Sequence, residues 1–223
     1  DPSPSEATDY SGAVYVYARV NGRWDQQAYV KASNQGGSFG ATVALSADGN
    51  TLVAGAPAES SNASGVNGNQ ADTSVFGAGA AYVFTRTTGT WAQQAYIKPV
   101  LEVLQPSTFF GSALALSADG KTLAVGSPGE YNGLNTPNQI NFGGAVHVYA
   151  RNNDTWTVHS RVTSSEAEDS DRFGTQLAIS GDGQTLAVGA PHRKGFLAPD
   201  ALHPSGRYVS SVGAAYVLTR NGA

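Results

Sequence analysis

The chain lacks cysteine and methionine, and it carries little charge. Without cysteine there can be no disulfide bond, thiolate metal site or cysteine nucleophile. Charged residues make up 13% of the 223 residues and the formal net charge is −4, so no basic stripe marks a nucleic-acid interface. No run approaches the roughly 18–20 apolar residues of a membrane-spanning helix. We therefore expect no nucleic-acid partner and no membrane span, in a chain long enough for a large core.

The 27 glycines are the first positive signal, because many of them recur in a fixed motif. Phe-Gly is followed by an Asp-Gly turn and then by Gly-Ala-Pro or Gly-Ser-Pro, and this order returns along the chain. The copies are Phe39-Gly40, Asp48-Gly49 and Gly55-Ala56-Pro57; Phe110-Gly111, Asp119-Gly120 and Gly126-Ser127-Pro128; and Phe173-Gly174, Asp182-Gly183 and Gly189-Ala190-Pro191. Internal repeats of this kind indicate that one structural unit is stacked several times.

A second motif alternates with the first and supplies the other half of the unit. It reads Gly-Ala-Val-Tyr-Val-Tyr or a close variant, and a tryptophan follows most copies. The copies begin at Gly12, Gly79, Gly144 and Gly213, and the tryptophans are Trp24, Trp91 and Trp156. Together the motifs predict four short strands per repeat: A and B around Asp-Gly, C in the second motif, and D with the tryptophan. We therefore predict an all-β chain that forms a β-propeller with four-stranded blades; a β-sandwich with a duplicated hairpin is the alternative.

The strand count predicts an incomplete ring. In chain order the strands run C-D, A-B-C-D, A-B-C-D and A-B-C, which is about 3.25 blades of a single β-propeller domain or fragment over residues 1–223. The predicted blades cover 12–32, 39–98, 110–162 and 173–220. Propellers usually close with about four to eight blades. We expect a longer polypeptide or further chains to complete the ring, and we expect the isolated chain not to be a stable monomer.

Long loops join strands B and C at 58–78, 129–143 and 192–212, and their sequences differ. Strand polarity places these loops and the crossovers between blades on one face of the disc, where function usually lies on a rigid scaffold. Aromatic residues in the loops are candidates for ligand binding, by stacking on sugar rings or inserting into a partner; packing of the loops is the alternative. These residues are Phe76, Tyr131, Phe142, Phe196 and Tyr208.

Phe39-Gly40 followed by Gly55-Ala56-Pro57, in a unit of this size, resembles the FG-GAP repeat of integrin α-subunit propellers. The phrases at 44–52, 12–17 and 24–31 look closer still to bacterial exported FG-GAP proteins. The resemblance covers nearly the whole chain. It implies a β-propeller that is secreted or exposed on the bacterial cell surface, in a family that includes adhesins and sugar binders.

The same resemblance raises the question of calcium, because the A–B turn of the integrin repeat is a calcium loop. Here Ala44 and Ser46 stand at the first two ligand positions, and only Asp48 matches. Because Ca²⁺ takes about six to eight oxygens, we favour plain type I′ hairpins and no cofactor, with Ca²⁺ as the open alternative. Candidate metal ligands are Asp48, Asp119 and Asp182 in the turns, Glu59, Asn67, Asn69 and Asp72 in the first long loop, and Glu130, Asn135 and Asn138 in the second.

No set of residues predicts catalysis. The sequence has no Gly-Xaa-Ser-Xaa-Gly elbow and no phosphate loop. His147 replaces a tyrosine of strand C, and we expect it to fill an interface between blades. The acidic run 166–171 is expected to be solvated, with contact to a cation or a basic partner as the alternative. We therefore expect that the chain is not an enzyme.

The sequence thus favours an extracellular module for protein–protein recognition, adhesion or assembly. Its expected partner is a protein, or a further copy of the chain that completes the propeller. One alternative is a carbohydrate-binding, lectin-like propeller with the loop aromatics as stacking platforms. The other is a structural accessory subunit of a larger extracellular complex.

Overall fold

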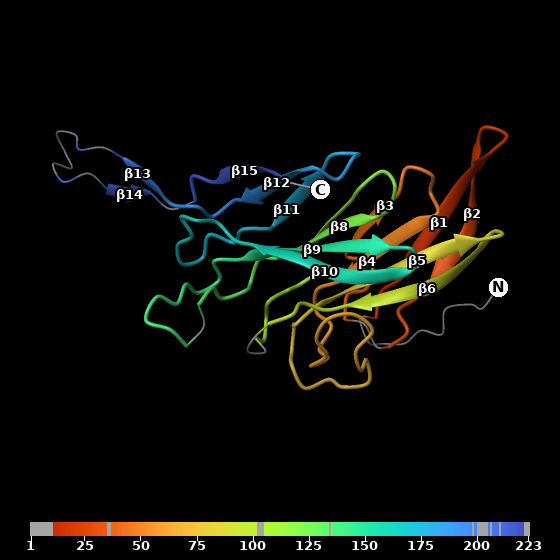
Figure 1. The fold of residues 1–223 in the computed structure, drawn as a ribbon, viewed down its shortest axis with the longest axis horizontal. Coiled ribbons are helices and arrows are strands. Elements are labelled where there is room, and N and C mark those ends of the chain that lie inside the picture. The colour runs from red at the N-terminus through yellow and green to blue at the C-terminus, as the bar shows by residue number, and fades with distance from the viewer. Residues whose placement is uncertain are drawn as a thin grey trace.

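The computed structural model describes residues 11–34, 37–101, 105–133, 135–197, 199, 205, 207–209 and 211–220. This part of the chain contains fifteen strands and no helix, so no helical element in it is long and apolar enough to cross a membrane. Four antiparallel sheets of two, four, four and three strands follow one another, and we call them blades 1 to 4 (Figure 1). The predicted all-β propeller fold is confirmed, and the ring of described blades is not closed.

Each blade is a simple antiparallel meander in chain order. Blade 1 contains β1 (Val14–Val20) and β2 (Arg23–Val30). Blade 2 contains β3 (Thr42–Leu45), β4 (Thr51–Ala56), β5 (Ala80–Thr87) and β6 (Thr90–Ile97). Blade 3 contains β7 (Ala113–Leu116), β8 (Thr122–Ser127), β9 (Ala145–Asn152) and β10 (Thr155–Val162). Blade 4 contains β11 (Gln176–Ile179), β12 (Thr185–Ala190) and β15 (Ala214–Thr219).

A further hairpin interrupts blade 4, and the sequence did not predict it. It consists of β13 (Gly195–Leu197) and β14 (Arg207–Val209), which pair with each other inside the third long loop. Neither strand joins the sheet of β11, β12 and β15. In the described residues, the third long loop therefore contains a strand pair, whereas the first two long loops contain no strand.

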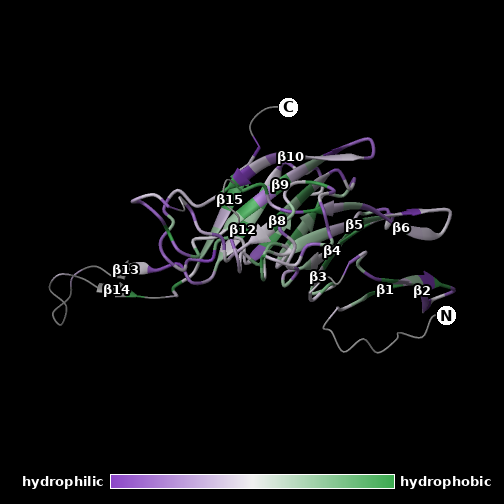
Figure 2. Cartoon of the chain, turned by 90° about the horizontal axis from the view of Figure 1, so that it is seen from below, coloured by the Kyte–Doolittle hydropathy of each residue, from purple (hydrophilic) through white to green (hydrophobic). Residues whose placement is uncertain are grey.

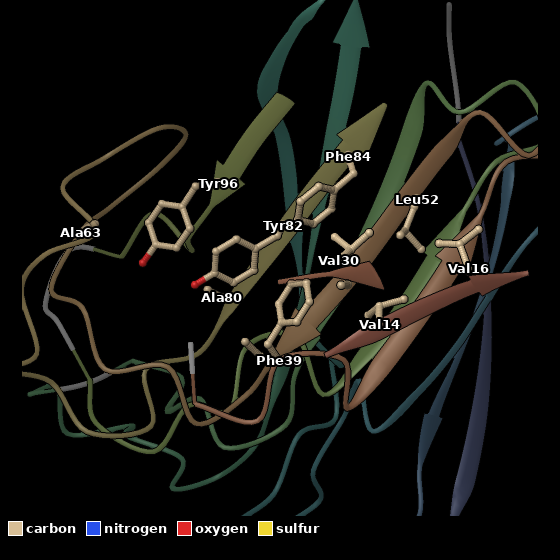
Figure 3. Close-up of a cluster of buried hydrophobic side chains, with 12 residues drawn as sticks. Val14, Val16, Val30, Phe39, Leu52, Ala63, Ala80, Tyr82, Phe84 and Tyr96 are labelled. Carbon is tan, nitrogen blue, oxygen red and sulfur yellow. The ribbon is translucent and has the colours of Figure 1, made fainter. Parts of the chain in front are cut away.

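The blades pack face to face, and each pair of neighbours shares an apolar cluster. Val14 and Val16 of blade 1 lie against Tyr82 and Phe84 of blade 2 (Figure 3). Phe39 fills the same space, with its ring centroid 5.3 Å from that of Tyr82 in an edge-to-face contact. Large side chains of the later blade thus pack on small branched side chains of the earlier blade.

The opposite face of blade 2 is also buried, which separates this fold from a sandwich. Val53 and Val83 point away from blade 1 and pack with Leu123 and Tyr149 of blade 3. A third cluster joins blades 3 and 4. Because a two-layer sandwich leaves one face of each sheet in water, burial on both faces excludes the sandwich alternative. In Figure 2 the hydrophobic colour follows strands such as β8 and β12 inside the stack.

The two sequence motifs meet at the junction between blades. Gly79, at the start of the second motif, forms a parallel bridge with Phe110 of the next Phe-Gly motif. Its φ is +74°, and a Cβ atom there would lie 2.1 Å from the carbonyl oxygen of Phe110. The same bridges join Gly12 to Phe39 and Gly144 to Phe173. The glycine is therefore required both by its backbone conformation and by the closeness of the neighbouring blade.

The Asp-Gly turns are not type I′ hairpins, so that prediction was wrong. Of the two central residues, only Gly49 has a positive φ, whereas a type I′ turn needs two. The Gly49 amide donates to the Ser46 carbonyl at 2.9 Å, and the Ser46 amide donates to the Thr51 carbonyl at 2.9 Å. This closes a four-residue loop. The Asp48 carboxylate accepts from the Ser46 hydroxyl and the Asn50 amide, and these bonds favour the four-residue form.

The first and last blades each expose one face. On blade 1, Tyr15 and Tyr17 are 51% exposed and Trp24 is 68% exposed. On blade 4, Val217 is 72% exposed. The exposed face of blade 1 thus carries large aromatic side chains, and the exposed face of blade 4 carries a small one. Between neighbouring blades, a face with large side chains packs on a face with small ones.

Candidate functional site

The connections of each blade lie at two opposite ends of its strands. Short turns such as those between β5 and β6 lie at one end, and the loops after β4, β8 and β12 lie at the other with the crossovers between blades (Figure 1). We call this second end the loop face. Each long loop starts with a charged residue four positions after the glycine of Gly-Ala-Pro or Gly-Ser-Pro. These residues are Glu59, Glu130 and Arg193.

Glu59 anchors the first long loop through a buried ion pair. Its Oε2 atom accepts a hydrogen bond of 2.6 Å from Nζ of Lys98, which follows β6. Its Oε1 atom accepts from Nδ2 of Asn34 and from the Ser61 amide, each at 3.1 Å. Burial lowers the pKa of the Lys98 ammonium, and the charge of Glu59 opposes that shift. The start of this loop is thus attached to the last strand of its own blade.

Glu130 anchors the second long loop and is fully buried. Its Oε2 lies 2.7 Å from Nε2 of His147 on β9, and its Oε1 accepts from Nε of Arg161 at 2.6 Å. Arg161 also donates to Oδ1 of Asn132 at 2.6 Å. Burial raises the pKa of the Glu130 carboxyl, but the hydrogen bond and charge of His147, together with Arg161, outweigh it and hold that pKa below its ordinary value.

Arg193 anchors the third long loop, and here the sign of the charge is reversed. Its guanidinium faces Glu166 at 3.4 Å, Glu168 at 3.2 Å and Asp171 at 3.6 Å. The prediction that the acidic run is solvated was therefore wrong for Asp171, which is buried, because an arginine of the same chain neutralises it. Sequence analysis missed this position, although the same offset from the repeated glycine marks it in all three repeats.

The predicted aromatic residues are distributed over the three long loops. Phe76 is 71% exposed in the first long loop. Tyr131 and Phe142 in the second loop pack edge to face on each other, with ring centroids 4.9 Å apart. Phe196 and Tyr208 are backbone partners across the β13–β14 hairpin, and their side chains lie outside the described part of the structure. Among the candidate loop aromatics whose side chains are described, Phe76 is the most exposed.

The candidate calcium ligands of the first loop accept hydrogen bonds from the chain itself. Oδ1 of Asn67 accepts from the Tyr96 amide, and Oδ1 of Asn69 accepts from the Ala71 amide. Oδ1 of Asp72 accepts from the Asn62 amide and from both the amide and the hydroxyl of Ser74. In the second loop Glu130 is paired as described above, and the Asn135 amide donates to Gln139. The side-chain hydrogen bonds of Asn67, Asn69 and Asp72 stabilise the conformation of the first long loop.

The aspartates of the A–B turns share one arrangement. Each carboxylate accepts a hydrogen bond from the serine two positions before it and from the amide two positions after it. The serine bond is the main cause that lowers the pKa of all three carboxyls. The residues are Asp48 with Ser46, Asp119 with Ser117, and Asp182 with Ser180. In the described residues no three acidic or histidine side chains are grouped as metal ligands would be, and calcium binding stays a prediction.

A polar cleft lies between blades 2 and 3 at the end of the short turns. Its volume is about 520 Å³, and Arg86, Lys121 and Arg151 line it together with Asp48 and Asp119. Charges of both signs face each other there, so the cleft suits a polar ligand without a strong net charge.

Comparison with known proteins identifies the repeat. Residues 156–218 match the family model of the FG-GAP repeat. The predicted resemblance is thus confirmed for this segment, and blades 2 and 3 show the same motif geometry. No curated protein sequence matches the chain.

Two solved structures are similar to the chain at low identity. One is a protein from Lactobacillus plantarum, with 15% identity, a TM-score of 0.49, and coverage of 92% of this chain and 52% of the other. The other is a putative 6-phosphogluconolactonase from Bacteroides uniformis, with 12% identity, a TM-score of 0.46, and coverage of 92% and 51%. The chain therefore spans about half the length of the solved structures that it matches.

The prediction that the chain is not an enzyme requires correction. The sequence argument was that no familiar catalytic motif is present, and one of the similar structures is that of a putative 6-phosphogluconolactonase. The absence of a familiar catalytic motif therefore does not show that the chain lacks catalytic activity, because function depends on the residues of a site and not on the fold.

Proposed function

We propose that the chain is a recognition module that binds a protein partner through its loop face, outside the cell, in adhesion or in the assembly of a larger complex. The observation that carries this proposal is Phe76, whose side chain is 71% exposed on that face. Exposed aromatic side chains dominate the binding energy of many protein interfaces. The FG-GAP match supports a place outside the cell, because the repeats that the sequence resembles belong to integrin α-subunits and exported proteins.

The loop around Phe76 is held in place before any partner binds. The Phe76 carbonyl accepts from the Ser107 amide at 2.9 Å, and the Val75 amide donates to the Ser60 carbonyl at 2.9 Å. The Glu59–Lys98 ion pair fixes the start of the same loop. Because the backbone is already ordered, binding through Phe76 loses little conformational entropy.

Selection from a displayed protein-binder library tests the loop face. The immobilised chain is the target, and enriched binders are measured against Phe76→Ala and against Val158→Ala, an exposed residue on β10. We expect a class of binders whose affinity falls at least tenfold with Phe76→Ala and is unchanged with Val158→Ala. If every enriched binder tolerates Phe76→Ala, the loop face is not the recognition surface that we propose.

Carbohydrate binding is the second candidate, and the ring pair of Tyr131 and Phe142 favours it. Both rings are partly exposed and lie on the loop face, where a sugar ring can stack. A glycan array should then show binding that Tyr131→Ala removes and Phe76→Ala leaves unchanged. An array without any bound glycan would remove this candidate.

A further inference from the structure

Glu59 joins a buried amine to a side-chain amide at the junction of blades 1 and 2. Its Oε2 atom accepts a hydrogen bond from Nζ of Lys98 at 2.6 Å, and its Oε1 atom accepts one from Nδ2 of Asn34 at 3.1 Å. Lys98 follows β6, and Asn34 lies in the crossover from β2 to β3. One carboxylate thus holds a nucleophile beside an amide that an amine can attack.

The side-chain amide of Asn34 is fixed in one orientation by its other contacts. Its Oδ1 atom accepts a hydrogen bond from the Tyr82 hydroxyl, and its Nδ2 atom also donates to the Gln70 carbonyl at 3.0 Å. Figure 3 shows the hydroxyls of Tyr82 and Tyr96 pointing to the same side, out of the apolar cluster. Burial raises the pKa of the Tyr82 phenol, so it remains an O–H donor. Such a donor stabilises the negative charge that develops on the amide oxygen during attack.

The surroundings exclude water and favour the neutral amine of Lys98. Lys98 and Glu59 are each 1% exposed, and Tyr82 and Tyr96 beside them are fully buried. Burial lowers the pKa of the Lys98 ammonium, so a larger fraction of it lacks the proton and is nucleophilic. Because water is kept out, hydrolysis of the amide does not compete with attack by the amine.

The next junction keeps the glutamate but lacks the amine. Glu130 takes the place of Glu59 and pairs with Arg161. A guanidinium keeps its proton in proteins, so Arg161 does not attack an amide. One blade earlier, the counterpart of Lys98 is Lys31, which also stands seven positions after the tryptophan of its blade but is exposed. Anchoring a loop therefore does not require a lysine, and the buried lysine beside an asparagine distinguishes the junction of blades 1 and 2.

We propose that Lys98 and Asn34 form an intramolecular isopeptide bond, with Glu59 as the catalytic base and acid. Nζ of Lys98 attacks Cγ of Asn34, so that a new C–N bond forms and the bond from Cγ to Nδ2 breaks. The ammonium of Lys98 gives up two protons, and Glu59 carries them in turn to Nδ2, which leaves as ammonium. Glu59 ends as the carboxylate that it was at the start, and the reaction needs no oxidant.

The bond ties the crossover before blade 2 to the end of the last strand of that blade. Residues 34–98 then form a closed covalent loop that contains all four strands of blade 2. In a chain without cysteine, this constraint takes the role that a disulfide has elsewhere. Cross-links that close long loops stabilise a fold because they restrict the unfolded chain. The inference does not depend on the function proposed for the loop face.

Intact-mass spectrometry of the whole purified chain tests for the bond. We expect a mass that is lower than the mass of the sequence by one ammonia, in a chain that is folded by circular dichroism. Trypsin should then release residues 32–86 and 87–121 as one branched peptide, since it does not cleave before Pro99. The fragment ions of this peptide should place the bond between Asn34 and Lys98.

Variants of the chain identify the groups that react. Lys98→Arg keeps a positive charge facing Glu59 but removes the nucleophile, so this variant should keep its full mass. Glu59→Gln removes the group that carries the protons and should also keep its full mass. Lys31→Arg is the matched control, because it makes the same change at the equivalent position of blade 1. It should lose one ammonia as the original chain does.

Two results would overturn the proposal. One is an original chain that is folded and still has its full mass after prolonged incubation at neutral pH. The other is a loss of ammonia that persists in Lys98→Arg, because an asparagine before a glycine, such as Asn67, loses ammonia when it forms a succinimide with its own backbone. Either result would leave Lys98 and Glu59 as an ion pair only. If a variant fails to fold, the branched peptide of the original chain decides by its presence or absence.

Discussion

At the scale of single residues, one repeat position changes its charge: Glu59 and Glu130 are buried there, and Arg193 is partly buried. Glu59 pairs with Lys98 and Glu130 with His147 and Arg161, while Arg193 pairs with acidic residues of the preceding crossover. A buried charge is tolerated only with a partner, so a change of sign at this position needs a change of sign around it. Each pair fixes the first residues of a long loop, which lets the rest of the loop vary.

Glu130→Gln should destabilise the chain because it leaves His147 and Arg161 facing a neutral side chain. Removing one member of a buried pair costs about 3–5 kcal/mol, so we expect a loss of about 3 kcal/mol in the free energy of unfolding at pH 7. Denaturation in urea measures it. Asp154→Asn is the matched control, because Asp154 is 86% exposed and its pair with Arg151 should contribute less than about 1 kcal/mol. Equal losses in the two variants would contradict this assignment.

The same carboxylate should make stability depend on pH. The folded pKa of Glu130 lies below its ordinary value of 4.5, so the stabilisation is complete above that pH and is lost as the pH falls through the folded pKa. Thermal unfolding between pH 6 and pH 3 should therefore show a fall in the midpoint of the original chain. Glu130→Gln should show a smaller fall, since it no longer titrates. Parallel curves would show that other carboxyls cause the acid sensitivity.

Most of these side-chain contacts could not be predicted from the sequence. Asp48 was placed correctly in a turn, but its hydrogen bonds with Ser46 and Asn50 select a four-residue loop that the Asp-Gly pair alone does not reveal. Glu59 and Glu130 were read as metal ligands because their partners, Lys98 and Arg161, lie 39 and 31 residues away. Only the fold brings such residues together.

At the scale of elements, the strand pattern was readable because it repeats. Two motifs with fixed spacing predicted the strands of the blades, since each copy supports the others. The β13–β14 hairpin was missed because the sequence of the third long loop does not repeat in the other two long loops. The sequence did not show why glycine recurs at the start of the second motif. The structure gives the reason: the backbone of the next blade lies too close to Gly79 and its equivalents for a Cβ atom.

Gly79→Ala should destabilise the junction between blades 2 and 3. Gly89→Ala is a matched control, because Gly89 has a similar positive φ of +86° but no atom within 4 Å of its added Cβ. We expect about 1–2 kcal/mol for the control from backbone conformation alone. Overlap with the Phe110 carbonyl should add about 1–3 kcal/mol in Gly79→Ala. Chemical denaturation measures both, and similar losses would mean that the neighbouring blade moves away easily.

At the scale of the whole molecule, the described blades form a series with two unlike open faces. Tyr15, Tyr17 and Trp24 on blade 1 belong to the large-residue face that inner blades bury against a neighbour. Val217 belongs to the small-residue face that receives it. Exposed apolar faces of this kind favour association in water. Because the two faces match in kind, we expect association to join the first blade of one copy to the last blade of the next.

We therefore expect sedimentation velocity at micromolar concentration to show species heavier than the 22.9 kDa chain. Trp24→Lys should shift the distribution toward the monomer, because it places a charge in the large-residue face. Val100→Lys is the control, since Val100 is an exposed apolar residue between blades 2 and 3 and should leave the distribution unchanged. Closed head-to-tail rings would stop at a fixed size, whereas open chains would grow with concentration. A single monomeric boundary at every concentration would contradict this prediction. It would show that the exposed faces of blades 1 and 4 do not pack on each other as the faces of the inner blades do.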